Sequence, residues 1–414
     1  MRAPLYSSQA DELLSEHAIL NPHALYDRLR CSSPVARIAE SGVHLVTSWE
    51  LVHEALDRES DFSANLTGVL YRGADGQPAC FELPQSVATA VIATADEPRH
   101  SVHRALLQAR FTPSSIASFE QPVKQWADQV LSPLIAAGGG DAMDACERVP
   151  ALVVAHLLGL PVEDVDDFRV WAMMGGDMLA GEVTGEGLTF LATETARMSD
   201  YLGRHFDSAF DNISSESDAP LMHTLAAGVQ AGQISREEAL GIAIVLFGAG
   251  GESTAALIAS CFKILAERPD LFQQLRVERS LINRFVEEVV RLESPFKFHY
   301  RSVKTECELG GYALQPGDRL MLVWAAANRD GQALPEAHAL RLDRKHAKQH
   351  TGFGRGAHFC IGAVLARLEA KIMIECLLDG AETIELVAQG AAYANSIFVR
   401  RLNKLQLNIR ERVV

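Results

Sequence analysis

A glycine-rich loop with a single cysteine leads directly into a helix-forming stretch in GFGRGAHFCIGAVLAR, residues 352–367. Glycines at positions 354, 356 and 362 allow positive φ and let the backbone approach a flat ligand closely. Cys360 precedes the expected helix, where unpaired backbone N–H groups and the helix dipole favour a thiolate. This segment constrains the fold most, because it predicts one negatively charged sulfur at a helix N-terminus.

Three interpretations of this loop are open from the residues alone. It forms a turn with an incidental buried cysteine, it carries a cysteine nucleophile that needs a nearby base, or it supplies a thiolate ligand to haem iron. The chain has seven widely scattered cysteines and no CxxC pair, which argues against a zinc site or a disulfide framework. A reducing cytoplasm is therefore the expected compartment.

Composition and charge narrow the class of protein. Hydrophobic residues make up 48% of the 414 residues and charged residues 22%, which is typical of a protein with a substantial core. The formal net charge of −15 disfavours a broad phosphate-binding surface, so nucleic acid is not an expected partner. The N-terminus shows no secretory signal pattern. The most apolar run, residues 241–251, is shorter than the roughly 20 residues of a membrane span, so no membrane anchor is expected.

The pattern along the chain predicts a single large domain, residues 1–414, that is mainly α with a small β component. No repeat, low-complexity tract or long Pro/Gly/Ser linker divides it. Helical spacing of apolar residues is found at 21–30, 49–57, 99–111, 119–137, 149–160, 167–182, 189–210, 235–269 and 281–295. Strand-like alternation is found at 43–48, in a hairpin at 307–322, and at 397–411.

Two segments of this pattern stand out. Residues 63–92 lack steady periodicity and are predicted to form one long loop, and loops of that length tend to be functional. Residues 235–269 are predicted to form one very long helix, which opens with the capping-box pattern of Ser235 and Glu238 and stops at Pro269.

The spacing Phe-Gly-x-Gly-x-His-x-Cys-x-Gly-x-x-Leu-Ala-Arg, from Phe353 to Arg367, resembles the signature of the cytochrome P450 family, the haem-thiolate monooxygenases. The resemblance covers nearly the entire chain. It implies the cytochrome P450 fold, with haem b (iron-protoporphyrin IX) between the long central helix and the cysteine-loop helix. It makes Cys360 the iron ligand and places Phe353, His358 and Gly362 in the haem site.

Two further motifs match the family in the expected order. Glu288-Val-Val-Arg291 resembles the family's Glu-x-x-Arg element, whose ion pair is buried behind the cysteine loop. In isolation this spacing would suggest a surface pair that contributes a few tenths of a kcal/mol. Asn328 and Arg329, in Asn-Arg-Asp, resemble the family's motif of that type, and the resemblance implies that they join the same structural network.

Haem carries two propionates, and burying these anions without partners is very unfavourable. A haem pocket therefore needs cations or hydrogen-bond donors from different segments. The resemblance supplies four such residues: His100 and Arg104 on the helix after the long loop, Arg301 downstream of Glu-x-x-Arg, and His358 two residues before the cysteine.

The stretch AGGEST, residues 249–254, interrupts the apolar central helix with two glycines, each of which costs up to roughly 1 kcal/mol relative to Ala. It resembles the family segment that bulges over the haem to admit O₂. In that register Ala249 and Gly250 line the oxygen cleft, Glu252 is the acid and Ser253 is the alcohol. An acid beside a hydroxyl can relay protons.

Serine stands where the family usually has threonine, so we expect looser coupling of electrons to product, or a share of the role for Thr254. The alternative is that Ser253 only hydrogen-bonds back to its own helix.

By resemblance, substrate contacts the 63–92 loop, the central helix near Val245 to Ala249, the segment from Phe296 to His299, which includes Phe298, and the turn at Ile397 and Phe398. These segments predict a hydrophobic small-molecule substrate. Lys297 and His299 are polar exceptions that either orient a carboxylate or hydroxyl or lie at the surface. DFSANLTG and WAAANRD are similar to segments of a soluble bacterial subgroup, in which fatty acid, terpenoid, steroid and polyketide-type substrates all remain open.

No flavin or iron–sulfur motif follows the haem segment, so we expect a ferredoxin-type redox partner to supply electrons to a monomer. An acidic protein needs a local basic patch to dock such a partner. The candidates for this patch are Arg99, Arg104, Arg110, Arg355 and Lys371.

The leading hypothesis is an O₂-dependent monooxygenase that hydroxylates or epoxidises its substrate. Three alternatives follow. A peroxide-driven haem-thiolate hydroxylase generally lacks an acid–alcohol pair such as Glu252 and Ser253. A non-catalytic haem-binding protein leaves the oxygen-activating residues unexplained. A cysteine hydrolase without haem lacks a convincing base and oxyanion arrangement.

Overall fold

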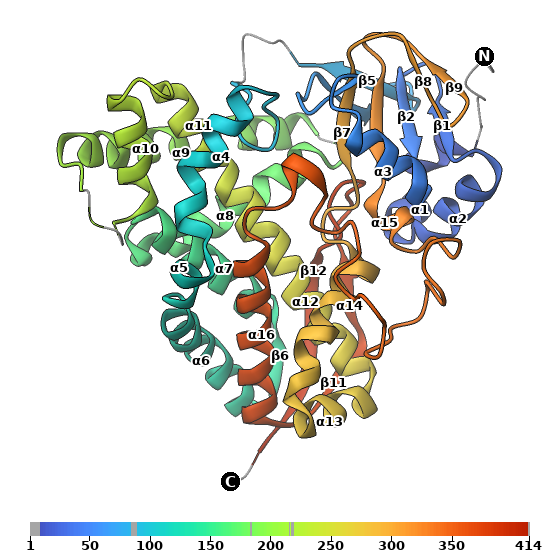
Figure 1. Ribbon diagram of the computed structural model, residues 1–414. Helices are drawn as coiled ribbons and strands as arrows, with labels where there is room; N and C mark the ends of the chain where they lie inside the picture. Colours follow the sequence, from blue (N-terminus) through green and yellow to red (C-terminus); the bar gives the residue numbers. More distant parts are fainter. Residues whose placement is uncertain (1–8, 84–88, 183, 215, 217–218, 413–414) are drawn as a thin grey trace.

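Helices form most of the chain, and a smaller β region lies beside the N-terminal helices at one side of the molecule (Figure 1). The computed structural model describes residues 9–83, 89–182, 184–214, 216 and 219–412. The prediction of a mainly α fold with a small β component is confirmed. The helices are α1 (Glu16–Leu20), α2 (His23–Ser32), α3 (Trp49–Asp57), α4 (Arg99–Gln108), α5 (Pro113–Ala117), α6 (Glu120–Ala136), α7 (Met143–Leu158), α8 (Val165–Met178), α9 (Gly185–Asp211), α10 (Leu221–Gln230), α11 (Arg236–Leu246), α12 (Ser253–Glu267), α13 (Pro269–Val277), α14 (Ile282–Glu293), α15 (Trp324–Ala327) and α16 (Ala363–Gly380).

The largest sheet of the described chain has five strands in the order β1-β2-β10-β7-β3. β10 pairs parallel with β2 and antiparallel with β7. His299 and Arg301 are two residues apart on β7, so they face the same side of the sheet. The strands are β1 (Val35–Ile38), β2 (Val43–Val46), β3 (Phe62–Ser63), β4 (Gly68–Arg72), β5 (Pro78–Glu82), β6 (Gly139–Asp141), β7 (His299–Val303), β8 (Cys307–Leu309), β9 (Tyr312–Leu314), β10 (Arg319–Leu322), β11 (Ala381–Tyr393) and β12 (Leu402–Glu411).

The prediction of one long loop at 63–92 is wrong for its first half. β4 and β5 pair antiparallel there as a hairpin. The turn between them is closed by a hydrogen bond from Gly73 N to Gln77 O, and Gly76 has φ +81°. Asp75 accepts a hydrogen bond from Gln77 N, which is a turn contact that its short carboxylate favours. Local turn chemistry therefore sets the hairpin where apolar periodicity is weak. Residues 84–88 lie outside the described part.

The long central helix is present and contains one irregularity. Ser235 and Glu238 form the predicted capping box, in which each side chain accepts from the other residue's backbone N–H. A π-helical segment, Phe247–Glu252, separates α11 from α12. The helix ends at Glu267, and Pro269 occupies the first turn of α13. Such π segments frequently mark functional sites.

The paired glycines of the π segment permit close helix packing. A Cβ at Gly250 would lie 2.8 Å from Val154 Cγ2 of α7, and one at Gly251 would lie 2.5 Å from Ala172 Cβ of α8. Both distances are shorter than real Cβ contacts, so side chains at these positions would push α7 and α8 away. Close packing against α7 and α8 therefore offsets the cost of two glycines within the central helix.

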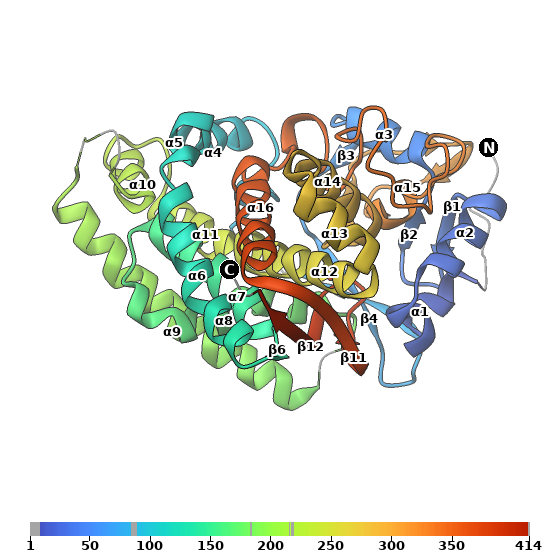
Figure 2. The same ribbon diagram turned by 90° about the horizontal axis from the view of Figure 1, so that it is seen from below.

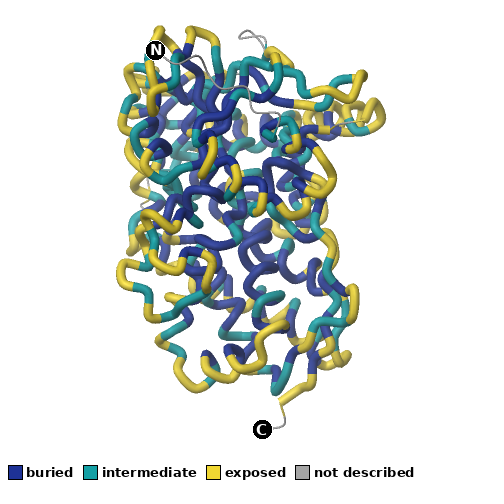
Figure 3. Tube along the Cα trace, turned by 90° about the vertical axis from the view of Figure 1, so that its right-hand side faces the viewer, coloured by how far each residue is buried: buried dark blue, intermediate teal, exposed yellow. Residues whose placement is uncertain are grey.

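The central helix lies in the core of the molecule. α12 packs against α7, α14, α16 and β11. Seen from below, it crosses the centre of the molecule beside α14, α16 and the β11–β12 pair (Figure 2). Residues Arg236–Glu267 are long and apolar enough to cross a membrane, but 67% of their most apolar window is buried inside the protein. Buried segments run through the interior, while exposed segments gather at loops and ends (Figure 3).

The remaining predicted elements are largely found. The hairpin at 307–322 forms β8, β9 and β10, and the C-terminal alternation forms β12. β10 is followed, after Val323, by the short helix α15. β11, a strand of 13 residues that pairs with β12, was not predicted. Its only fully buried side chains are widely spaced among half-exposed ones, so its alternation is weak.

Candidate active site

One cavity brings together residues from the central helix, the cysteine loop, α4 and β7. Including its open mouth, it holds about 1500 Å³ of empty space. Most residues that the sequence predicts for cofactor or substrate contacts line this cavity. They are His100, Arg104, Val245, Ala249, Gly250, Ser253, Thr254, Phe296, Arg301, Phe353, His358, Cys360 and Gly362.

The cysteine loop is held in a tight turn ahead of α16. Cys360 N donates a hydrogen bond of 2.8 Å to Phe353 O. Gly354 and Gly356 both have φ +69°, as the sequence predicts, because a side chain would strain the backbone there. Gly362 does not need positive φ, since its φ is −83°. A Cβ there would lie 3.9 Å from Cys360 Sγ, which is ordinary van der Waals contact, so neither the backbone conformation nor the neighbouring protein atoms require glycine at this position.

The sulfur of Cys360 is enclosed by protein but keeps accessible surface that faces the cavity. Burial raises the pKa of the thiol above its ordinary value, while the backbone N–H of Gly362 and the cation of Arg104 act to lower it. The expected effect of the backbone N–H groups at the start of α16 is therefore present, but burial outweighs it and the net shift of the pKa is upward. A bound metal cation would reverse it, because a coordinating thiol is deprotonated outright.

No base hydrogen-bonds to Cys360 within the described residues, so the nucleophile interpretation has no support there.

The π segment and the start of α12 form the part of the cavity wall that carries Ala249, Gly250, Ser253 and Thr254. Ser253 Oγ donates a hydrogen bond to Ala249 O, four residues earlier. This is the back-bonded arrangement that the sequence analysis set as the alternative to a relay role. Ser253 and Thr254 both line the cavity, and Thr254 is only 2% exposed.

Glu252 does not line the cavity with Ser253. Its side chain is buried against α8, where Arg401 Nη1 donates to its Oε1 at 2.9 Å. Arg401 Nη2 donates in turn to Asp177 Oδ1 at 2.7 Å. A Cβ on Gly176 would lie 2.1 Å from Glu252 Oε1, so a side chain at position 176 would displace the carboxylate from this position. Burial raises the pKa of Glu252 from 4.5 to about 8. The acid and the alcohol therefore do not touch.

A cluster of basic side chains occupies another part of the wall. The rings of His100 and His358 lie 4.1 Å apart between centroids. Arg104 donates to Phe359 O at 2.6 Å, and the buried Arg301 donates to Tyr300 O at 2.8 Å. His100 Nε2 and His358 Nδ1 are buried without a hydrogen-bond partner among the described residues. Burial, followed by Arg301, lowers the pKa of His358 to about 3.

These observations test whether haem fits the cavity. The basic cluster holds two guanidinium groups and two unpartnered imidazole nitrogens, and none of the four side chains has an ion pair to a buried carboxylate within the described chain. Two carboxylates of a ligand would satisfy these groups. The same cavity presents one soft sulfur ligand at Cys360. The residues present fit haem.

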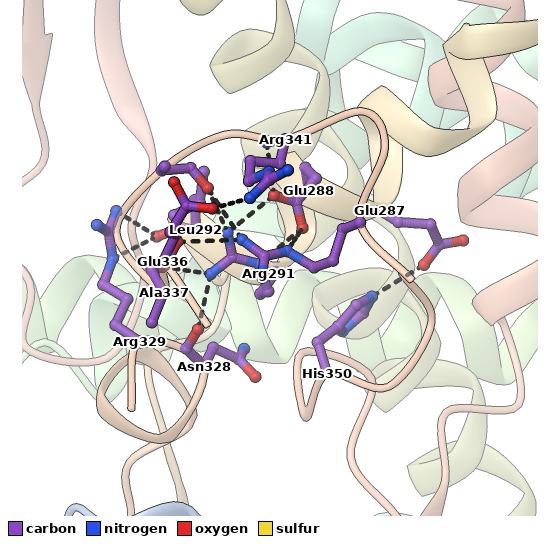
Figure 4. A network of polar contacts seen from close by, with 12 residues as sticks. Glu287, Glu288, Arg291, Leu292, Asn328, Arg329, Glu336, Ala337, Arg341 and His350 are labelled. Carbon is purple, nitrogen blue, oxygen red and sulfur yellow. Dashed lines mark hydrogen bonds and ion pairs between the residues drawn. The ribbon is translucent and has the colours of Figure 1, made fainter. Parts of the chain in front are cut away.

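A buried ion-pair network is centred on Glu288 and Arg291 of α14 (Figure 4). Arg291 donates to both carboxylate oxygens of Glu288, at 2.7 and 2.9 Å, and the two side chains are 1% and 0% exposed. Arg291 also donates to the backbone oxygen of Asn328 at 2.9 Å. Arg329 donates to Leu292 O at the end of α14. Glu288, Arg291 and Asn328 are therefore joined by hydrogen bonds, whereas Arg329 is attached to the end of α14 through Leu292 O.

Sequence reasoning missed the other members of this network. Arg344 Nε donates to Glu288 Oε1 at 2.9 Å, from 56 positions away in the chain. Glu287 forms a second pair, in which Arg367 donates at 2.6 Å and His350 lies at 2.9 Å. Arg367 and Glu287 adjoin motif residues, so that pair carried a sequence signal. Arg344 carried none.

The predicted substrate residues divide into two layers. Val245 and Phe296 line the cavity. Phe298, Ile397 and Phe398 do not, because they are packed in the hydrophobic core behind it. Phe398 stacks on Phe296 with ring centroids 4.6 Å apart and so backs the lining residue.

Lys297 and His299, the two polar residues of the predicted substrate segment, lie in different surroundings. Lys297 is buried away from the cavity and donates to Ile19 O and Ser396 O, at 3.3 and 2.5 Å. Lys297 therefore neither orients a ligand nor lies at the surface, because its two hydrogen bonds connect α1 to the C-terminal turn. His299 lines the cavity.

The candidate docking residues are mostly paired. Arg99 forms an ion pair with Glu238, Arg355 lies 3.5 Å from Asp57, and Lys371 lies 3.7 Å from Glu375. Arg110 contacts the hydroxyl of Thr224. Arg104 turns toward the cysteine loop, as its bond to Phe359 shows. These cations therefore form no separate uncompensated patch within the described chain.

Comparison with known proteins gives a consistent result. The cytochrome P450 family model matches residues 194–382. Cytochrome P450 144 of Mycobacterium tuberculosis is 38% identical over 98% of this chain and 92% of that protein. The vitamin D(3) 25-hydroxylase of Pseudonocardia autotrophica is 30% identical over 95% of this chain and 94% of that protein. The crystal structure of CYP109E1 from Bacillus megaterium with testosterone has a TM-score of 0.82 and 27% identity, over 95% of this chain and 99% of that one.

A helical fold that encloses one cysteine and a basic cluster in a single cavity defines a haem-dependent oxidoreductase. With the relatives above, the chain belongs to the cytochrome P450 family. It is a haem-thiolate monooxygenase by class, and enzymes of this family use haem b with iron.

Proposed function

We propose that this cytochrome P450 inserts one oxygen atom from O₂ into a hydrophobic small molecule by hydroxylation or epoxidation. The observation that carries the proposal is the shared cavity of Cys360, the basic cluster and the π segment. One soft ligand, partners for two carboxylates and a helix irregularity with hydroxyls all face the same space. A sensor or carrier of haem would not need the hydroxyls.

Cys360 Sγ would hold the iron. His100, Arg104, Arg301 and His358 would hold the propionates, and Phe353 and Gly362 would line the cavity beside the sulfur. Bound haem supplies the activation of dioxygen at its iron. The protein supplies binding, orientation and exclusion of water.

Proton delivery falls to Glu252, Ser253 and Thr254. Because burial raises the pKa of Glu252 to about 8, its carboxyl holds a proton at neutral pH. Ser253 Oγ–H occupies the cavity wall and is free to donate when it leaves Ala249 O. Thr254 offers a second hydroxyl there. A water molecule between Glu252 and Ser253 would complete the path.

The substrate we propose is hydrophobic, because apolar side chains such as Val245 and Phe296 line much of the cavity. Relatives support this class: CYP109E1 has been crystallised with testosterone and with corticosterone. We propose further that residues 1–414 form one domain that acts as a monomer in the cytoplasm. A ferredoxin-type protein would supply the electrons, as is typical of bacterial members of the family.

The test is oxygen-isotope incorporation. Ligands that shift the spin state of the haem are selected first, and then turned over with NADH, a ferredoxin and its reductase under ¹⁸O₂. The proposal predicts one ¹⁸O atom per product molecule and no turnover without O₂. Oxygen from water, or equal rates with hydrogen peroxide alone, would contradict it, and the latter would favour the peroxide-driven alternative.

A further inference from the structure

His299 is a polar side chain in a largely apolar part of the cavity wall. It lies at the start of β7 beside two other lining residues, with ring centroids 5.7 Å from Phe296 and 5.8 Å from Trp324. Protein surrounds the ring, yet it keeps accessible surface. That surface therefore faces the cavity.

One hydrogen bond fixes the tautomer of His299. Trp324 Nε1 donates to His299 Nδ1 at 2.7 Å. An indole N–H is only a donor, so Nδ1 must be the acceptor and the proton of the neutral ring lies on Nε2. Burial, with a smaller effect of Arg301, lowers the pKa of His299 to about 4, so the ring is neutral at pH 7.

The second nitrogen of the ring has no partner within the described chain. Nε2 makes no hydrogen bond to a described residue, and it is not among the buried atoms sealed from water. An enclosed donor that stays unpaired is unfavourable by about 1–3 kcal/mol. The neighbouring Lys297 does not share this property, because two backbone carbonyls already accept from its ammonium group.

We propose that the Nε2–H of His299 is a specificity-determining hydrogen-bond donor that selects hydrophobic ligands with an oxygen acceptor, such as a carbonyl or hydroxyl. The inference rests on the proposed function, whose substrate class it narrows. A hydrocarbon of the same shape leaves the donor unpaired, whereas an oxygen-bearing ligand satisfies it. Sites built to bond a polar group discriminate in this way.

A haem propionate is the competing acceptor, since Arg301 lies two residues along the same strand. Arg301 and Arg104 are charged and therefore stronger partners for a carboxylate than a neutral imidazole. If His299 served the propionate, its loss would weaken haem binding before any substrate was added. If it serves the substrate, haem content is unchanged in its absence.

The binding test uses a matched pair of probes, cyclohexanone and methylenecyclohexane, which differ in C=O against C=CH₂. Their dissociation constants are measured with the haem-loaded enzyme by ligand-observed NMR. His299→Phe should weaken cyclohexanone relative to methylenecyclohexane by roughly 3- to 10-fold. His299→Gln retains a donor and should lose less. Phe296→Leu, a lining change without a donor, should affect both probes by the same factor.

Each other outcome overturns the proposal. These outcomes are an unchanged probe ratio in His299→Phe, equal losses in the Phe and Gln variants, no binding of either probe to wild type, or loss of haem from His299→Phe without ligand. If wild type shows thiolate-ligated haem and only the probe ratio fails, the inference fails and the proposed function stands. If the wild type lacks thiolate-ligated haem, the proposed function itself is contradicted.

A spectroscopic test needs no ligand. Histidine ¹⁵N NMR of the CO complex, with the signal assigned by its loss in His299→Phe, should show the Nε2–H tautomer at pH 7. Trp324→Phe removes the N–H that fixes this tautomer and should allow exchange between both forms. A protonated ring or the Nδ1–H tautomer in wild type would overturn the inference.

Discussion

Replacing Arg291 by lysine keeps its charge but removes the planar fork that ties the buried network together. The guanidinium donates five hydrogen bonds: two to the carboxylate of Glu288 and one each to the backbone oxygens of Asn328, Ala337 and Ala339. Both members of the ion pair are almost fully buried. A lysine ammonium has three donors, so at least two of these five hydrogen bonds are lost.

The size of the effect follows from these numbers. Each lost hydrogen bond to a buried group costs about 1–3 kcal/mol, so Arg291→Lys should lower stability by roughly 2–6 kcal/mol. Domains are stable by about 5–15 kcal/mol in total. The entropy of unfolding for 414 residues is about 0.9 kcal/mol per kelvin near the midpoint, so Tm should fall by roughly 2–7 °C.

The assay is thermal unfolding of the haem-loaded enzyme, followed by far-UV circular dichroism at pH 7. Arg341→Lys is the matched control, because Arg341 is 39% exposed and pairs with the exposed Asp343 at 2.7 Å. The control should change Tm by less than about 1 °C. A Tm for Arg291→Lys within 1 °C of wild type, or an equal fall in the control, would refute the reasoning.

Four further predictions concern the π segment and the docking face. Burial raises the pKa of Glu252 from 4.5 to about 8, so the folded protein keeps this carboxyl protonated where the unfolded chain would ionise it. The protonated carboxyl therefore contributes fully to the free energy of unfolding below pH 4.5, and this contribution is lost as the pH rises from 4.5 to about 8. The Tm of Glu252→Gln should therefore rise relative to wild type from pH 5 to pH 9, and a relative fall would contradict this. Ser253→Ala should release more hydrogen peroxide per product in a coupled assay, and unchanged coupling would remove Ser253 from the relay. Gly176→Ala places a Cβ 2.1 Å from a Glu252 oxygen, so we expect Tm to fall by roughly 1–3 °C and peroxide release to increase. An unchanged Tm with unchanged peroxide release would show that the carboxylate moves aside without consequence. Arg355→Glu should slow reduction by a ferredoxin and flatten its salt dependence in stopped-flow measurements, whereas unchanged rates would exclude Arg355 from the docking face.

Local patterns in the sequence predicted the parts of the site that local forces determine. The turn around Cys360 needs glycine at two positive-φ positions, and the capping box at Ser235 needs only a four-residue pattern. The cavity also gathers His100 and Arg301, which the family resemblance had placed together. These features depend on short spacings that a single chain displays directly.

The contacts of the site that the sequence did not predict have two physical explanations. Glu252 and Ser253 are adjacent on a helix, and adjacent positions point about 100° apart, so they face α8 and the cavity respectively. Arg344, Arg401 and the Trp324–His299 bond join segments far apart in the chain. Only the packed fold decides which distant donor reaches a given acceptor, so no spacing rule predicts them.

The most direct test is the absorbance spectrum of the reduced, haem-loaded enzyme with carbon monoxide. Wild type should show the strongly red-shifted Soret band of a thiolate-ligated haem, and Cys360→His should lose that band while keeping haem. A wild-type spectrum typical of histidine-ligated haem, or a red-shifted band that persists in Cys360→His, would contradict the assignment of Cys360 as the iron ligand.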